Sequence, residues 1–335
     1  MDIFVNGQWL PFIFMVLMGV SILAYVILDG YDLGVGILMS RADNAEKDRM
    51  IASIGPFWDA NETWLVLGIG ILLVAFPAAH GLILTALYLP TACMLGGLIL
   101  RGVSFDFRAK AKAQHKHFWD KTFIGGSLLA SLAQGYMLGA YILGFDSSWM
   151  AVGFGMLVGI CLVAGYSFVG AAWLIMKTDG ALQRRSVYWA RVSLWGTAFG
   201  MALVSLATPL ISQRIFDKWF SVPNFLFLLP IPLMAGLLIV ILEISLRKLP
   251  QPNDRLCWMP FSGAGGLFIL GFLGLAYSFY PYIIPDQMTI WQAASAPESL
   301  MIILIGTLIV LPCIIGYTIL AYRVFWGKAK DLSYY

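Results

Sequence analysis

Charged residues are scarce in this sequence, and hydrophobic residues are abundant. Of 335 residues, 12% are charged and 60% are hydrophobic, and the mean hydropathy is +0.83. Ordinary globular proteins contain roughly 25% charged residues, so this composition excludes a soluble globular chain. The apolar runs last about 20 residues, whereas the strands of a membrane barrel alternate over about 10. The sequence therefore predicts an all-α polytopic membrane protein.

Cysteine and histidine are also scarce, which argues against a metal or haem centre in this chain. The cysteines form no Cys-x-x-Cys pair, so we interpret them as small apolar packing residues. The histidines lie outside the predicted apolar runs, where a buried haem would need its ligands. Any redox cofactor is therefore expected in a partner chain. The histidines are His80, His115 and His117, and the cysteines are Cys93, Cys161, Cys257 and Cys313.

Signals of two further classes are missing. Gly34-Val35-Gly36 lacks the strand–helix context of a phosphate-binding loop, so no nucleotide or nucleic-acid partner is expected. The segment Met1 to Phe4 has no basic region, so the first apolar run is predicted to be a retained helix rather than a cleaved signal peptide.

Nine apolar runs divide the chain, and together they predict one integral membrane domain over residues 1–335. The longest predicted loop, Gly102 to Asp120, is too short for a soluble domain. Pairs of glycines at G-x-x-x-G spacing allow helices to approach closely. These pairs are Gly30/Gly34, Gly135/Gly139 and Gly155/Gly159. The predicted spans are 10–38, 57–77, 82–101, 121–143, 150–175, 188–208, 224–246, 260–280 and 298–322.

The distribution of basic residues predicts the orientation of these spans. If the N-terminus lies outside, only Arg214 and Lys218 of the 21 Lys and Arg residues fall on the outer side. Cytoplasmic loops carry the excess of Lys and Arg in membrane proteins. The sequence therefore predicts an outer N-terminus and a cytoplasmic C-terminus, and an error of one span would mix the two sets.

Two pairs of acids stand inside the first two apolar runs. Asp29 and Asp32 belong to the first run, and Asp59 and Glu62 belong to the second. Each pair has i,i+3 spacing, which puts both side chains on one helix face. A carboxylate at membrane depth costs roughly 3 kcal/mol and indicates function by default.

The predicted topology brings these acids to one depth in the cytoplasmic half, together with Arg101 at the end of the third span. Such a group can form a polar pathway, because a carboxylic acid in a low-dielectric setting can be neutral or ionised at working pH. The alternative is that the acids touch headgroups and water, and that Asp59 and Glu62 complement the helix dipole. The pathway reading suits proton transfer into a reaction centre or proton-coupled transport.

Two other functions remain open from the residues alone. A proton-coupled secondary transporter would have broken helices and a midplane site between inverted repeats, whereas these acids lie toward one face. A purely structural assembly subunit would tolerate replacement of the acids without kinetic cost.

Four sequence blocks in the first third of the chain resemble subunit II of the cytochrome bd-type quinol oxidases. They are DGYDLGVG at 29–36, GPFWDANETW at 55–64, FP at 76–77 and RGVSFDFR at 101–108. The modest length and short loops resemble the cyanide-insensitive branch of that family. The resemblance implies two four-helix bundles plus one peripheral helix, in a bacterial inner-membrane complex with a homologous-looking subunit I.

The resemblance also implies where the cofactors lie. Subunit I of that family carries two b haems and haem d, or a b-type equivalent, and oxidises quinol, while subunit II carries no haem. The complex oxidises two quinols with O2 and forms two waters. Some members hold a structural quinone in subunit II, and the resemblance allows for a small accessory subunit and bound membrane lipid.

A polar channel along subunit II feeds protons to the oxygen-reducing haem in that family. Trp58 matches a family position near the partner's haems. Helix spacing adds Asp29 and Glu62 to the channel, because it puts them on the same helix faces as Asp32 and Asp59. The positions that match the family's channel are Asp32, Asp59, Arg101 and Asp106.

Overall fold

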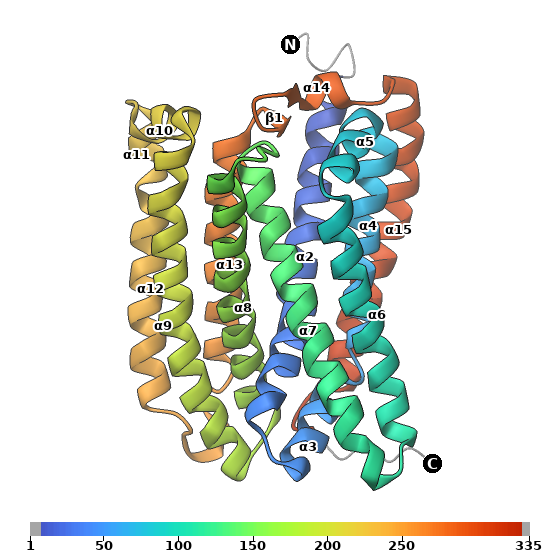
Figure 1. Cartoon of the computed structure of the whole chain (residues 1–335), viewed down its shortest axis with the longest axis vertical. Coiled ribbons are helices and arrows are strands. Elements are labelled where there is room, and N and C mark those ends of the chain that lie inside the picture. The colour runs from blue at the N-terminus through green and yellow to red at the C-terminus, as the bar shows by residue number, and fades with distance from the viewer. Residues whose placement is uncertain (1–7, 330–335) are drawn as a thin grey trace. The chain divides into compact units, whose positions relative to one another are not determined.

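The computed structural model describes residues 8–329, and these residues are mostly helical, with one short β-hairpin and the loops that join the elements. The segment Met1 to Phe4, which was said to lack the basic region of a signal peptide, lies outside the described residues. Within the described part, nine helices are long and apolar enough to cross a membrane, as the sequence predicted (Figure 1). They are α2 (Leu10–Leu38), α4 (Trp58–Ala75), α6 (Tyr88–Lys110), α7 (Ala113–Ile142), α8 (Trp149–Lys177), α9 (Gly180–Ile211), α12 (Pro230–Arg247) preceded by α11 (Asn224–Leu228), α13 (Met259–Phe279) and α15 (Pro297–Val324).

Short elements connect the spans. The polar connection after α2 contains a helix, α3, that the hydropathy pattern did not reveal. The others cap the ends of spans or form the hairpin. They are η1 (Met39–Arg41), α3 (Asn44–Ile54), α5 (Pro77–Ala86), α10 (Gln213–Phe220), η2 (Pro252–Asp254), β1 (Tyr282–Ile284), β2 (Met288–Thr289) and α14 (Ile290–Ala293).

The chain forms two compact units, and the division falls within α2. The first unit comprises Met1–Asp29, Pro56–Leu87 and Phe279–Trp326. The second unit comprises Gly30–Gly55, Tyr88–Ser278 and Gly327–Tyr335. The first unit therefore contains most of α2 with α4, α5, the hairpin, α14 and α15, and the second contains α3 and α6 to α13.

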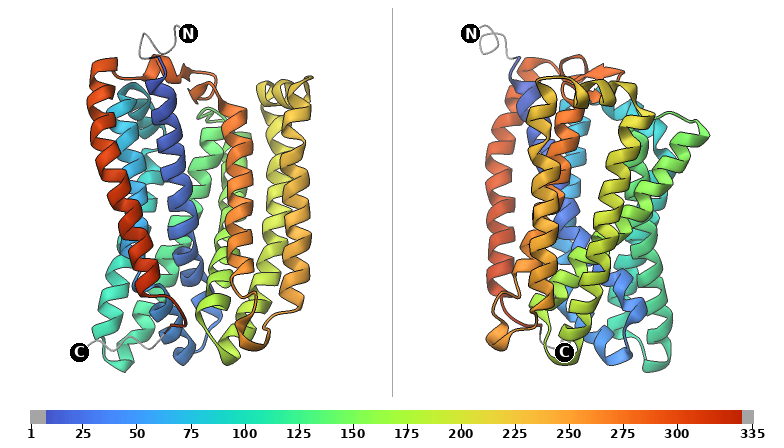
Figure 2. Two further views of the ribbon diagram at one scale, coloured as in Figure 1. Left: turned by 180° about the vertical axis from the view of Figure 1, so that it is seen from behind. Right: turned by 90° about the vertical axis from the view of Figure 1, so that its left-hand side faces the viewer.

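The first unit is held together at the end that carries α5, α14 and the hairpin (Figure 2). The strands pair antiparallel, with Tyr282 opposite Thr289. Ser295, just before α15, donates its backbone N–H to the carbonyl of Ala75 at 2.9 Å and its hydroxyl to the carbonyl of Val74 at 2.7 Å. These bonds satisfy carbonyls at the C-terminal end of α4, which its own helix leaves unpaired.

The second unit depends on close crossings between α6, α7, α8 and α9. A Cβ added to Gly135 of α7 would lie 2.5 Å from the Cα of Gly159 in α8, and one added to Gly139 would lie 2.7 Å from the Cα of Gly155. Only glycine permits backbones to approach this closely. The prediction that these four glycines mark a close helix crossing is confirmed.

Several predicted boundaries were wrong at the polar ends of the spans. The region 102–120, predicted as a loop, is almost entirely helical, because α6 continues through Lys110 and α7 starts at Ala113. Hydropathy marks only the part of a helix in hydrocarbon, while Ala, Lys and Arg favour continuation of the helix into the polar layer. For the same reason α9 begins at Gly180, eight residues before the predicted start.

Three further positions differ from the predicted spans. The predicted span 82–101 combined two helices, since α5 ends at Ala86 and α6 begins at Tyr88. His80, which precedes that predicted span, lies in α5, and Pro209, one residue beyond the predicted span 188–208, lies inside α9. Pro77 occupies the first turn of α5, where a proline costs no hydrogen bond.

Candidate functional site

Both acids of α2 are completely buried. Asp29 and Asp32 have exposed fractions of 0%. They are the only acids among the 29 residues of α2, and they lie in its C-terminal third. Burial of two carboxylates in an otherwise apolar helix requires polar surroundings, since an isolated buried charge is far too costly.

Glycines and aromatic rings fix the end of α2 that carries Asp32. A Cβ on Gly34 would lie 1.8 Å from the carbonyl oxygen of Tyr166, so α2 crosses α8 with backbones in direct contact. The ring of Tyr31 stacks on that of Trp173 with centroids 4.2 Å apart, and Phe261 of α13 meets Tyr31 edge-on at 5.6 Å. Because Asp32 lies between these anchors, its backbone position in the second unit is closely defined.

Arg101 is buried in α6, with an exposed fraction of 1%. Its backbone lies at another glycine crossing, where a Cβ on Gly126 would be 2.9 Å from the nitrogen of Arg101 and 2.6 Å from the oxygen of Gly97. A guanidinium stays protonated in proteins, so this is a permanent buried positive charge. Such a charge favours the ionised form of nearby carboxylates.

The start of α4 presents its two acids differently. Asp59 is exposed on the surface of this chain, while Glu62 and Trp58 are half-buried. Between them, Asn61 is completely buried. The Asn61 amide donates to the carbonyl of Leu28 at 3.2 Å, and its oxygen accepts from the Tyr322 hydroxyl at 3.3 Å. Asn61 therefore ties α4 to both α2 and α15 within the first unit.

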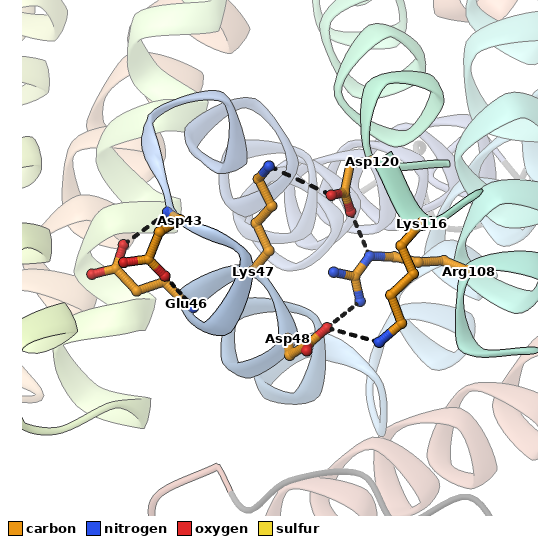
Figure 3. Close-up of polar contacts among 7 residues, drawn as sticks. All are labelled: Asp43, Glu46, Lys47, Asp48, Arg108, Lys116 and Asp120. Atoms are coloured by element: carbon orange, nitrogen blue, oxygen red, sulfur yellow. Dashed lines mark hydrogen bonds and ion pairs between the residues drawn. The ribbon is translucent and has the colours of Figure 1, made fainter. Parts of the chain in front are cut away.

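Asp106 of α6 is exposed. Arg108, two residues further along α6, is only 5% exposed and pairs with the buried Asp120 of α7. The Arg108 Nε donates to Asp120 Oδ1 at 2.5 Å, and its Nη1 donates to Asp48 Oδ1 at 2.7 Å. Lys47 lies 3.4 Å from Asp120 (Figure 3). The ion-pair cluster thus joins α3, α6 and α7 at one end of the second unit.

Helix α3 owes its start to a capping box, also drawn in Figure 3. The Asp43 carboxylate accepts from the backbone N–H of Glu46 at 2.9 Å, and the Glu46 carboxylate accepts from the backbone N–H of Asp43 at 3.2 Å. An acid or hydroxyl residue followed three positions later by Glu is a recognisable start signal for a helix. This signal was present in the sequence and could have revealed α3.

A third polar group lies at the C-terminal end of α8. Lys328 donates to the carbonyl of Thr178 at 2.7 Å and pairs with Asp254 at 3.1 Å. Gln183 donates to the other oxygen of Asp254 at 2.7 Å. The hydrogen bond from Gln183 and the charge of Lys328 hold the pKa of Asp254, in the loop after α12, below its usual value. Ala329 completes the contact by donating to the carbonyl of Lys177 at 2.7 Å.

The predicted site residues are divided between the two units. Asp29, Asp59 and Glu62 belong to the first unit, and Asp32, Arg101 and Asp106 belong to the second. In the described residues, no group of three or more His, Cys, Asp or Glu is arranged to hold a metal ion. What the chain offers chemically is a set of carboxylates, which can take up and release protons, together with a permanent buried cation and amide groups, which can hold carboxylates in place.

Comparison with known proteins identifies the family of this chain. A family model described as cytochrome bd terminal oxidase subunit II matches residues 10–325. This chain belongs to that family. It is 26% identical to cytochrome bd-I ubiquinol oxidase subunit 2 of Escherichia coli strain K12, over 97% of this chain and 96% of the relative. It is 27% identical to cytochrome bd ubiquinol oxidase subunit 2 of Bacillus subtilis strain 168, over 92% and 94% of the two chains.

A solved structure shows the same fold. The structure of bd oxidase from Geobacillus thermodenitrificans matches with a TM-score of 0.77 at 17% sequence identity, over 95% of this chain and 98% of the other. The resemblance seen in the four sequence blocks is therefore confirmed. The cytochrome bd subunit II described here is a multi-pass protein of the bacterial inner membrane and a component of a quinol oxidase complex, which includes haems and a subunit I.

Proposed function

We propose that this subunit II binds no haem itself and carries protons from the cytoplasm toward the oxygen-reducing haem of subunit I. The observation that carries the proposal is the burial of Asp29, Asp32 and Arg101 inside membrane-spanning helices, with exposed fractions of 0%, 0% and 1%. Burial of this kind is expensive, and in membrane helices it marks ion and proton pathways. Family membership supplies the oxygen-reducing reaction that consumes the protons.

The side of the membrane follows from charge. With the N-terminus outside, Arg214 and Lys218 are the only basic residues on the outer side, so the ion-pair cluster of α3, α6 and α7 faces the cytoplasm. The buried acids are then near the cytoplasmic end of α2. Protons drawn from that side make the oxidase electrogenic without a pump, at roughly 2.3 kcal/mol per charge per 100 mV.

Each residue of the proposed route has a role that fits its exposure. Asp106 and Asp59 are exposed and can exchange protons across the surface of this chain. Asp32, with Asp29, is the buried relay. Arg101 keeps a carboxylate of the route ionised, and half-buried Glu62 lies on the same face of α4 as Asp59. Trp58, also half-buried, faces the haems of the partner in this proposal.

The reaction served by the route is the oxidation of two quinols by O2 to two quinones and two waters. The relatives named above are ubiquinol oxidases, and we propose a quinol of this class as the electron donor. Two b haems and haem d, or a b-type equivalent, belong to subunit I in this proposal. The arrangement as one membrane domain of two four-helix bundles plus one peripheral helix, a structural quinone, and a small accessory subunit remain expectations of the same proposal.

Purification through an affinity tag on this chain tests the partner and its cofactors. We expect a haem-containing partner to copurify, with haem absorption bands and quinol-driven O2 consumption. A proton-coupled transporter would purify without haem and would move a solute in proteoliposomes. A colourless preparation without a partner, from cells that make both subunits, would contradict the proposal.

A further inference from the structure

A second charged cluster, which shares no residue with the proposed proton route, lies where α9 and α12 pack together. Glu243 of α12 is 6% exposed, and its Oε1 accepts two hydrogen bonds. One comes from Nη2 of Arg191 in α9 at 2.9 Å, and the other from Nε of Arg247 at 2.8 Å. The buried carboxylate thus holds two guanidiniums together, while their own side chains are 41% and 65% exposed.

The cluster carries an excess of one positive charge on an exposed face. Both arginines are permanently protonated, and one carboxylate cannot neutralise both. Each guanidinium has five N–H donors, and Glu243 accepts from only one nitrogen of each. Apart from the buried Nε of Arg191, the remaining N–H groups can donate to the oxygens of a phosphate.

The depth of the cluster matches the headgroup layer of a bilayer. Residues 192–211 of α9 contain no charged residue, and at 1.5 Å per residue they span about 30 Å, the thickness of the hydrocarbon core. In the neighbouring helices α11 and α12, residues 224–242 also contain no charged residue. Arg191 and Glu243 therefore stand at the same boundary, one residue beyond the apolar length of each helix.

Exposed apolar side chains continue from each arginine toward the membrane centre, on the helices seen side by side in Figures 1 and 2. On α9, Trp195 lies four residues from Arg191, and Phe199 follows after another four. On α12, Ile244 and Val240 lie three and seven residues from Arg247, and Leu237 follows after another three. Such spacings keep successive side chains near one face of a helix.

We propose that Arg191 and Arg247 bind the phosphate of an anionic phospholipid whose acyl chains lie along the exposed faces of α9 and α12. Charge complementarity selects this occupant: the surface offers two cations at headgroup depth and apolar side chains below them. Glu243 is a positioning residue that keeps the two guanidiniums converged. The proposal does not depend on the proton route.

The test counts lipids bound to the intact, haem-replete complex by native mass spectrometry after delipidation and titration with phosphatidylglycerol. We expect Arg191→Gln/Arg247→Gln to lower the apparent affinity of one bound lipid on the order of tenfold, since a basic residue near a membrane surface contributes several-fold. Arg49→Gln/Arg184→Gln removes the same charge from exposed positions at the same end of the second unit and should bind like the wild type. Arg191→Lys/Arg247→Lys, which keeps both charges, should recover part of the affinity.

Four results would overturn the proposal. Equal affinities for the Gln variant and the wild type show that no such site exists. Equal binding of phosphatidylcholine and phosphatidylglycerol shows that the site does not select an anionic lipid. Displacement of the lipid by millimolar inorganic phosphate shows that the site takes free phosphate. Loss of subunit I from the Gln variant, with the lipid count unchanged, shows that a protein covers this face.

Discussion

Two buried arginines, Arg101 and Arg108, differ in what their charge does. The charge of Arg108 is paired with the carboxylates of Asp120 and Asp48, and these contacts hold α3, α6 and α7 together. Arg101 is equally buried but belongs to the proposed proton route. The sequence pointed to Arg101 because it ends an apolar run, whereas no role was predicted for Arg108. The pairing of Arg108 could not be predicted, because Asp48 and Asp120 are distant in sequence and meet only in the folded unit.

Replacement of Arg101 tests its role in keeping an acid ionised. We expect Arg101→Leu to lower turnover and to move the acidic limb of the pH profile upward by about one unit or more, because loss of the cation makes the relay carboxylate harder to ionise. The measurement is quinol-driven O2 consumption across the acidic and neutral range. Arg101→Lys, which keeps the charge, should leave the limb near that of the wild type. An unmoved profile in the leucine variant would show that the assigned role is wrong.

Replacement of Arg108 tests the structural role of the ion-pair cluster. Arg108→Gln leaves the buried Asp120 carboxylate with only Lys47 at 3.4 Å, so we expect the free energy of unfolding to fall by about 3 kcal/mol or more. Arg49→Gln breaks an exposed pair with Asp179 and should cost less than about 1 kcal/mol. Denaturant unfolding of the two variants in detergent compares them, and similar losses would contradict a structural role for the cluster.

At the scale of elements, apolar runs predicted all nine spans in the described chain but not their ends. Hydropathy indicates only the part of a helix that lies in the hydrocarbon layer. The helices α6, α7 and α9 continue beyond that part, because the polar residues there also favour a helical backbone. Helix α3 was missed because it has a polar exposed face and no long apolar run. Its capping box, Asp43 and Glu46, can be recognised in the sequence. The glycine pairs of α7 and α8 could also be recognised in the sequence. Only the structure shows that Gly135 faces Gly159 and that Gly139 faces Gly155.

The α7–α8 crossing gives a prediction at this scale. Gly135→Ala places a Cβ 2.5 Å from the Cα of Gly159, and backbone cannot give way locally. We expect it to destabilise the protein by about 1–3 kcal/mol, as overpacking does. Gly153→Ala in α8 is the matched control, because an added Cβ there meets nothing within 4 Å. The measurement is the melting temperature of both variants in thermal unfolding. Equal melting temperatures would show that α7 and α8 can move apart without loss of stability.

At the scale of the whole molecule, the C-terminal segment closes on the second unit through Lys328 and Ala329. No sequence signal placed it there, since a lysine near a chain end is ordinary. The structure shows that it caps the carbonyls at the end of α8, where a positive charge also complements the helix dipole. Gln183 and Asp254 supply the other half of this contact.

The lowered pKa of Asp254 makes this contact pH-dependent. A carboxyl group whose pKa is lower when folded stabilises the protein above its unfolded pKa, about 3.9, and loses that contribution as pH falls through the folded pKa. We expect Asp254→Asn to accelerate hydrogen exchange of the Ala329 amide at neutral pH, and the ratio of variant to wild-type rates to approach one in acid. Asp146→Asn, in a distant exposed loop, should not change this ratio. A ratio that stays constant with pH would contradict the assignment.

The candidate route itself was predictable only in part. Acids in apolar spans are visible in any hydropathy reading, and the structure places Asp29, Asp32 and Arg101 in buried positions. It also shows what composition cannot, that Asp59 and Asp106 are exposed on this chain and that Asn61 bridges α2, α4 and α15. Whether a polar side chain is buried or exposed depends on which face of its helix packs against a neighbouring helix. That orientation is set by tertiary packing.

Turnover of relay variants in the assembled complex tests the central claim most directly. The measurement is quinol-driven O2 consumption by haem-replete complexes that carry Asp32→Asn or Asp59→Asn, with Asp217→Asn in exposed α10 as the control. An amide cannot take up and release a proton as a carboxylate does, so we predict a loss of roughly 10²-fold or more for a relay residue, the size typical of a lost proton-transfer group, with unchanged haem spectra. Wild-type turnover in the haem-replete Asp32→Asn and Asp59→Asn complexes would contradict the account and leave this chain a structural subunit.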